Sequence, residues 1–136
     1  MLFHEWSFKP MDKNQNMSLG NPINFHSIRY ENNSLYIWIG DSSCKMENLS
    51  CSLKTKYSND PLSTEILQVN CTEQVATNPS TDLAIKLAKK LNKQVFVSLN
   101  VPFAAVEFGE DESSLSIQQM VEKCLFEEIK AKPEMF

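Results

Sequence analysis

The residues of this chain that could carry chemistry are two histidines and four cysteines. A structural metal site would need ligands at regular spacing, and a nucleophilic pair would need a thiol of lowered pKa beside an imidazole. The sequence contains no Cys-x-x-Cys and no His-Glu-x-x-His segment, so neither arrangement is indicated. We interpret His26 as an ordinary strand histidine. The full set is His4, His26, Cys44, Cys51, Cys71 and Cys124.

The glycines of the chain exclude the common phosphate-binding loops. Gly20, Gly40 and Gly109 are the only three, so no Gly-x-Gly-x-x-Gly or Walker segment is present. A Gly-x-Ser-x-Gly nucleophile turn is also absent. We therefore expect a non-enzymatic protein with no catalytic residues, no metal and no cofactor. A cytosolic enzyme that depends on Cys and His is the alternative.

Length and composition narrow the class of protein. The chain has 136 residues, of which 42% are hydrophobic and 22% charged, as expected for a single globular domain over residues 1–136. A net charge of −4 argues against a general nucleic-acid binder and against a polybasic membrane-surface module. No apolar run approaches eighteen residues, so no transmembrane helix is expected.

The start of the chain and its cysteines bear on the compartment. The first residues lack the charged region and the apolar stretch of a signal peptide, so we expect a cytoplasmic protein, with the nucleus also open. Four cysteines and four Asn-x-Ser/Thr segments leave a secreted, disulfide-linked glycoprotein as a less favoured alternative.

The elements that would position these residues follow from hydrophobic periodicity. Two helices are predicted, one with Asn78 as N-cap and Asn92 as its end, the other capped by Ser116 and ended by Pro133. Short connections between the early strands predict an α+β fold, a mostly antiparallel, sandwich-like sheet of about six strands with two helices. Residues 9–22 and 101–114 are predicted to be mobile loops. Strands are expected at 2–8, 23–30, 34–40, 48–55, 63–69 and 94–100.

Alternation within the strands predicts what lies on each face of the sheet. The strand at 48–55 has an apolar row on one face and a row with Ser50 and Ser52 on the other, which we expect to face water. The strands at 34–40 and 94–100 are apolar on both faces, with Tyr36, Trp38 and Phe96 opposite the aliphatic rows. A second sheet of the same chain is the favoured cover for these aromatic residues. A partner protein is the alternative, since aromatic residues are enriched at interface cores.

Three lysines of the first helix lie on one helical face. Lys86, Lys90 and Lys93 follow i, i+4, i+7 spacing. The simplest interpretation is a solvated face. The alternative is a docking stripe for an acidic partner, which would act mainly on association rate and orientation.

One long segment resembles a known family. Residues 87–100, Leu-Ala-Lys-Lys-Leu-Asn-Lys-Gln-Val-Phe-Val-Ser-Leu-Asn, resemble the signature of proteasome assembly chaperone 4. The strand Leu-Tyr-Ile-Trp-Ile-Gly at 35–40, the preceding Phe25-His26 and the ending Lys-Pro-Glu-Met-Phe at 132–136 resemble the family in the same order. The likeness runs from about residue 24 to residue 136.

The resemblance implies an interaction protein. Members of that family have a small sandwich-like antiparallel sheet with helices and no catalytic residues. They pair as a heterodimer with a sister protein, proteasome assembly chaperone 3, and help α-type subunits form the ring of the 20S proteasome. Together with the strands that are apolar on both faces, this leads to a hypothesis for the partner-binding residues: Tyr36, Trp38 and Phe96, with Lys86, Lys90 and Lys93 as candidate contacts to an acidic subunit surface.

Overall fold

A computed structural model describes residues 1–9, 22–68, 79–101 and 117–136. Six described strands form one sheet in the order β1-β2-β3-β6-β4-β5, in which only β3 and β6 run parallel. The predicted α+β class and mostly antiparallel sheet are therefore confirmed. The elements are β1 (Leu2–Phe8), β2 (Ile23–Arg29), β3 (Leu35–Gly40), β4 (Asn48–Leu53), β5 (Leu62–Gln68), α1 (Pro79–Leu91), β6 (Val95–Asn100), α2 (Ile117–Ala131) and the short 3₁₀ helix η2 (Pro133–Met135).

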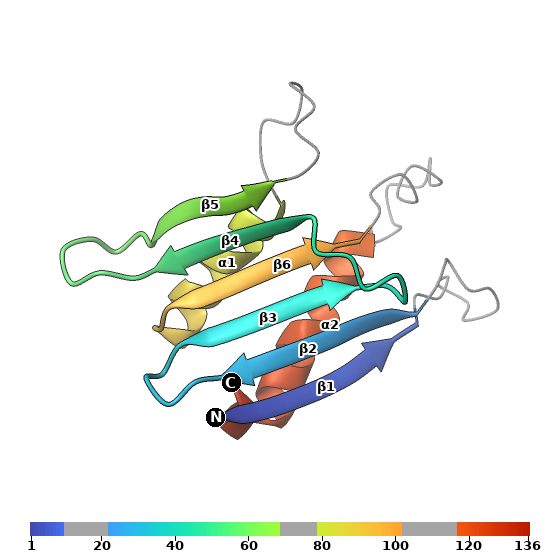
Figure 1. The fold of residues 1–136 in the computed structure, drawn as a ribbon. Helices are drawn as coiled ribbons and strands as arrows, with labels where there is room; N and C mark the ends of the chain where they lie inside the picture. The colour runs from blue at the N-terminus through green and yellow to red at the C-terminus, as the bar shows by residue number, and fades with distance from the viewer. Residues whose placement is uncertain (10–21, 69–78, 102–116) are drawn as a thin grey trace.

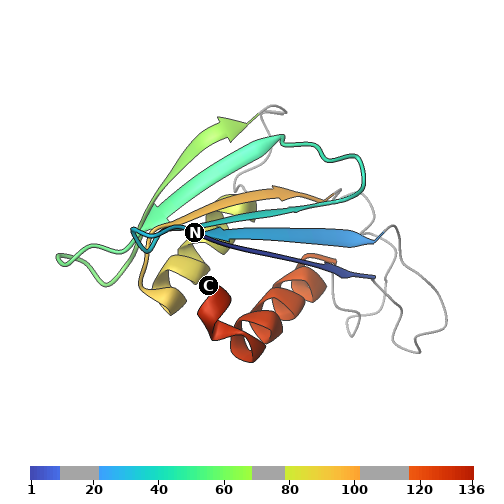
Figure 2. The ribbon, with the colours of Figure 1, turned by 60° about the horizontal axis from the view of Figure 1, so that its bottom comes forward.

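Both α-helices lie on the same face of the sheet. Figure 1 shows α1 behind the β4–β6 half and α2 behind the β1–β3 half, and Figure 2 shows both helices below the sheet. The opposite face carries no described element. Among the described residues, neither helix combines the length and apolar character that a membrane crossing requires.

The hydrophobic core fills the space between the sheet and the helices. Alternate residues of β3 and β6 point into it and are almost completely buried, as the period of two in a strand requires. The helices contribute their apolar stripes, which follow the 3.6-residue period. Central members are Leu35, Ile37, Ile39, Val95, Val97, Leu83, Leu87, Val121 and Leu125.

The end of α1 follows the predicted signal. Asn92 has a φ of 55°, and its N–H donates to the Ala88 carbonyl at 2.9 Å. Asparagine tolerates this left-handed conformation better than most residues, which explains why the helix ends there. Helix α1 begins at Pro79, where a missing N–H costs no helical hydrogen bond. The predicted caps Asn78 and Ser116, and the two predicted loops apart from residues 9, 22 and 101, lie outside the described residues.

Two predictions about the faces were wrong. All six described strands belong to one sheet, so within the described ranges no second sheet covers the aromatic residues. The serine row of β4 does not face water, because β4 pairs with β6 in a register that places Ser50 beside Val97 and Ser52 beside Val95, on the core side. Both serines are completely buried.

Hydroxyl groups of α1 explain how serines can occupy the core face. Ser50 Oγ lies 3.0 Å from Ser80 Oγ and 2.9 Å from Thr81 Oγ1, both in the first turn of α1. Ser52 Oγ donates to the Leu62 carbonyl at 3.1 Å. Buried hydroxyls that find partners in this way avoid most of the desolvation cost. The small side chains also let the start of α1 approach β4 closely.

Candidate functional site: the uncovered face of the sheet

An apolar row crosses the uncovered face from one edge of the sheet to the other. Its members are cross-strand neighbours in all six strands, and we call it the open-face row. It consists of Phe3, Ile28, Tyr36, Phe96, Cys51 and Thr64. The two ends of the row are exposed, its middle is half-buried by neighbouring side chains, and Cys51 is buried. An apolar row on a face that no described helix covers is typical of an interaction site.

The centre of the row is the Tyr36–Phe96 pair on the parallel strands β3 and β6. Both side chains are half-buried by their neighbours although no helix covers them. Burial, together with the nearby Tyr30, raises the pKa of the Tyr36 hydroxyl, so this group stays neutral at physiological pH. Cys51 lies beside Phe96, and its Sγ accepts a hydrogen bond from Gln94 Nε2 at 3.5 Å. The centre of the face is therefore uncharged and apolar.

Trp38 lies beside this row on the same face. It pairs across the strands with His26 on one side and Ser98 on the other. Its Nε1 donates to the Lys45 carbonyl at 3.0 Å, and its ring lies 5.3 Å from the His26 ring. His26 Nδ1 in turn lies 3.4 Å from a Glu5 carboxylate oxygen. The row that contains Trp38 is therefore polar where it crosses β2 and β1, unlike the apolar row beside it.

The β4–β5 end of the face is aliphatic. Leu49 pairs with Leu67, and Leu53 pairs with Leu62. Leu49 and Leu53 share the parity of Cys51 in β4, and their cross-strand partners lie on the same, uncovered face. Leu62 is 64% exposed, and every residue of β5 except Gln68 is exposed. The apolar surface therefore continues to the β5 edge of the sheet.

The three predicted lysines lie elsewhere, near the contact between α1 and the C-terminal elements. Lys86 Nζ forms an ion pair with Glu122 at 3.0 Å, and Lys90 Nζ lies 4.5 Å from the centre of the Phe126 ring. The placement of Lys93 on the first helix was wrong, because α1 ends at Leu91. Lys93 Nζ donates to a Phe136 backbone oxygen at 2.5 Å. Each lysine thus has a partner within the chain. A contact of these lysines with an acidic protein stays a prediction.

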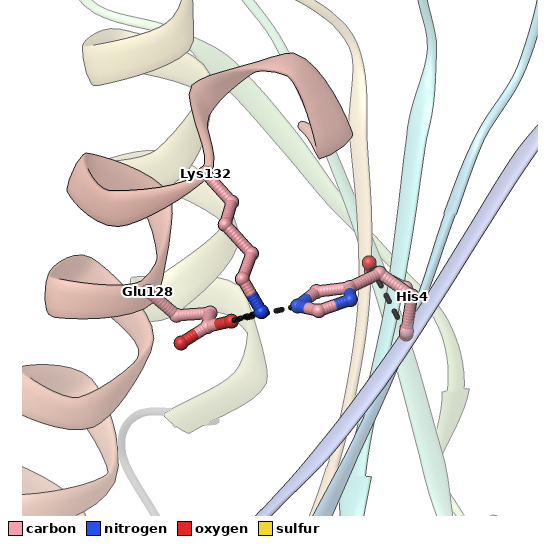
Figure 3. Close-up of polar contacts among 4 residues, drawn as sticks. His4, Glu128 and Lys132 are labelled. Carbon is pink, nitrogen blue, oxygen red and sulfur yellow. Dashed lines mark hydrogen bonds and ion pairs between the residues drawn. The ribbon is translucent and has the colours of Figure 1, made fainter.

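A second polar cluster joins β1 to α2. His4 Nε2 lies 2.7 Å from Glu128 Oε1, and Lys132 Nζ lies 3.2 Å from the same oxygen (Figure 3). The hydrogen bond from His4 is the main reason why the pKa of Glu128 lies below its ordinary value. The His4 ring also stacks on Trp6, with ring centres 4.8 Å apart. The cluster holds an edge strand against the helix layer.

The structure bears on two chemical arrangements, a thiolate nucleophile and a metal site. Burial raises the pKa of the Cys124 thiol, which is the opposite of what a thiolate nucleophile needs. Among the described residues, no three His, Cys, Asp or Glu side chains gather to hold a metal ion. Cys44, Cys51 and Cys124 are free thiols, and Cys71 lies outside the described residues.

The structure brings together part of the predicted site and adds to it. Tyr36, Trp38 and Phe96 do share one uncovered face, as their parity predicts. The sequence did not identify Ile28, Cys51 or the leucines as members of this face. The sequence shows which residues of a strand share a face. It does not show which of the two faces meets the helices, because that depends on the order of the strands in the sheet.

Comparisons with known proteins agree with this picture. The family model described as Proteasome assembly chaperone 4 matches residues 22–101, which span β2 to β6. The human protein named Proteasome assembly chaperone 4 is 33% identical over 114 residues, covering 84% of this chain and 80% of its own length. The mouse protein of the same name is 30% identical over the same shares.

A solved structure shares the fold. Its title is "Crystal Structure of a Novel Chaperone Complex for Yeast 20S Proteasome Assembly". The superposition covers 97% of this chain and 98% of that chain, with a TM-score of 0.59 and 10% sequence identity, so the likeness is one of fold. Given the matched family model and these relatives, the chain belongs to the proteasome assembly chaperone 4 family.

Proposed function

We propose that this protein is a non-enzymatic chaperone that pairs with a homologous, proteasome assembly chaperone 3-like protein and promotes assembly of the 20S proteasome α-ring. The observation that carries the pairing is the open-face row, an apolar row across all six strands that no described element covers. Membership of the family supports the connection with proteasome assembly.

The shape of the row favours a partner with a sheet of its own. Six strands are separated by five spacings of about 4.8 Å, so the row spans roughly 24 Å. A second sheet packs about 10 Å above the first and covers such a width with interdigitating side chains. A homologous chaperone would present the same kind of face. The sheet of the partner would then take the place of the second sheet that the sequence analysis expected within this chain.

The proposal separates the pairing surface from the surface that meets proteasome subunits. A partner on the open face leaves the helix layer accessible, and Lys86 and Lys90 lie there. These lysines, with Lys93, are candidate contacts to an acidic surface of an α-type subunit. Their charge would steer and orient the encounter more than it would add affinity.

Affinity purification of the tagged chain from its own cells tests the proposal. We expect one small homologous partner and α-type proteasome subunits without mature β-type subunits. Tyr36→Asp places a carboxylate in the centre of the open face and should lose the small partner. Recovery of neither partner nor α-type subunits with the unchanged chain would contradict the proposed function. Fractionation of the same cells tests the proposed cytoplasmic location.

A matched pair of lysine variants tests the second surface. Lys90→Glu should lower the yield of α-type subunits while the small partner is retained. Lys89→Glu is the control, because Lys89 is an exposed neighbour outside the predicted stripe. Equal yields from the two variants would remove Lys90 from the proposed contact.

A further inference from the structure

The indole ring of Trp38 lies directly over the backbone of Gly40. A Cβ atom placed on Gly40 would lie 2.5 Å from Trp38 Cζ2 and 2.7 Å from Cη2. Non-bonded carbon atoms are normally about 3.5 to 4.0 Å apart, so any side chain at residue 40 would displace the ring. Both residues are in β3 with the same parity, which places the ring flat along the strand on the uncovered face.

The polar edge of the same ring is also fixed. Trp38 Nε1 donates to the Lys45 carbonyl at 3.0 Å. Lys45 follows a hydrogen-bonded turn in which the Cys44 N–H donates to the Asp41 carbonyl at 3.2 Å and the Ser43 N–H donates to Asp41 Oδ1 at 2.9 Å. The β3–β4 connection thus aims one carbonyl at the indole N–H. The indole N–H therefore already has an acceptor within the chain, and burial by a partner would not leave it without one.

We propose that Gly40 and the Lys45 carbonyl form a seat that holds Trp38 flat, making it a preorganised anchor for the partner on the open face. The anchor role rests on the proposed function. A ring held in its bound orientation loses little conformational freedom on association, and interface anchors are often tryptophan. The flat face of the ring offers apolar contact area to a long apolar side chain from the partner's sheet.

Gly40→Ala in the full chain tests the seat, with binding of the purified proteasome assembly chaperone 3-like protein of the same organism measured by calorimetry. We expect roughly tenfold weaker binding, since the ring must leave its seat. In the same variant the indole N–H signal of Trp38 in the NMR spectrum of the free chain should move and exchange faster with solvent. Trp38→Phe assigns that signal, because Trp6 is the only other tryptophan.

A double-mutant cycle separates this role from a general loss of stability. Phenylalanine lacks the Cζ2 and Cη2 atoms that meet residue 40, so Gly40→Ala should cost little further affinity in a Trp38→Phe background. Equal costs of Gly40→Ala in both backgrounds, or unchanged binding by Gly40→Ala alone, would overturn the anchor.

Binding by the wild-type chain separates a failure of the proposed pairing from a failure of the anchor role. If the wild-type chain does not bind the homologous chaperone, the proposed pairing fails and the anchor role fails with it. If wild type binds and the cycle shows no coupling, pairing stands and only the anchor fails. The NMR measurement on the free chain tests the seat independently of any partner: an unchanged indole signal in Gly40→Ala would overturn it.

Discussion

The two faces of the sheet differ although the same strands build both. In β3, Leu35, Ile37 and Ile39 point to the helices and are completely buried, whereas Tyr36 and Trp38 on the other face are only half-buried. The helices of the same chain bury the covered face. The open face buries its aromatic rings only as far as neighbouring side chains can. Alternate residues of one strand can therefore serve folding and association almost independently.

The largest expected effect is on association, through the centre of the open face. Phe96→Asp should weaken pairing with the homologous chaperone at least about a thousandfold, because the partner would bury a carboxylate without a counter-charge. Phe96→Leu is the control and should pair with a much smaller loss. Calorimetry with circular dichroism of the free variant separates pairing from folding. A folded Phe96→Asp variant that still pairs would show that Phe96 lies outside the interface.

The covered face should respond in stability. Leu125→Ala removes a completely buried side chain of α2 and should lower the free energy of unfolding by about 2–5 kcal/mol. Leu62→Ala, at an open-face position that is 64% exposed, should cost less than about 1 kcal/mol in the free chain. Urea denaturation measures both. Similar losses of unfolding free energy in the two variants would contradict the view that the covered face contributes more to stability than the open face.

The buried serine row offers a smaller test of the covered face. Ser50→Ala removes hydrogen bonds to Ser80 and Thr81 and should lower the free energy of unfolding by about 1–2 kcal/mol. Ser63→Ala, at an exposed position of β5, is the matched control and should be nearly neutral. Pairing should be unaffected by both changes, since neither residue shares the parity of the open-face row.

Acid should weaken the contact between β1 and α2. The pKa of Glu128 is lowered in the folded chain, so its contribution to stability is present above its unfolded pKa and is lost as pH falls through the lower folded value. Glu128→Gln should therefore make stability less dependent on pH in the acid range. Glu127→Gln is a suitable control, because Glu127 is an exposed neighbour on the same helix. Identical acid denaturation curves of Glu128→Gln and wild type would contradict this assignment.

The secondary structure could be predicted from the sequence because its signals are local. The alternating strands and the stop at Asn92 depend on residues within a few positions of each other. Strand order is not local. The insertion of β6 between β3 and β4 turns Ser50 and Ser52 toward the helices. Partners far along the chain make that burial tolerable: hydroxyls of α1 for Ser50 and a carbonyl of β5 for Ser52.

The same limit applies to the candidate site. Tyr36, Trp38 and Phe96 could be selected because they are large aromatic residues in strands that are apolar on both faces. Phe3, Ile28 and Thr64 could not, because they join the row only through pairing across strands. The role of Gly40 could not be predicted either, because the sequence does not specify the orientation of the Trp38 indole.

The tie between His4 and Glu128 has a consequence for biosynthesis. The two residues are 124 positions apart, and α2 covers the β1–β3 half of the core face (Figure 2). While the ribosome is still making the chain, that half of the core lacks its α2 cover, because α2 follows all the described strands in the sequence. A nascent chain therefore exposes apolar surface on both sides of its sheet until α2 emerges. Such exposure invites aggregation, so timely capture by cellular folding factors would matter most in that interval.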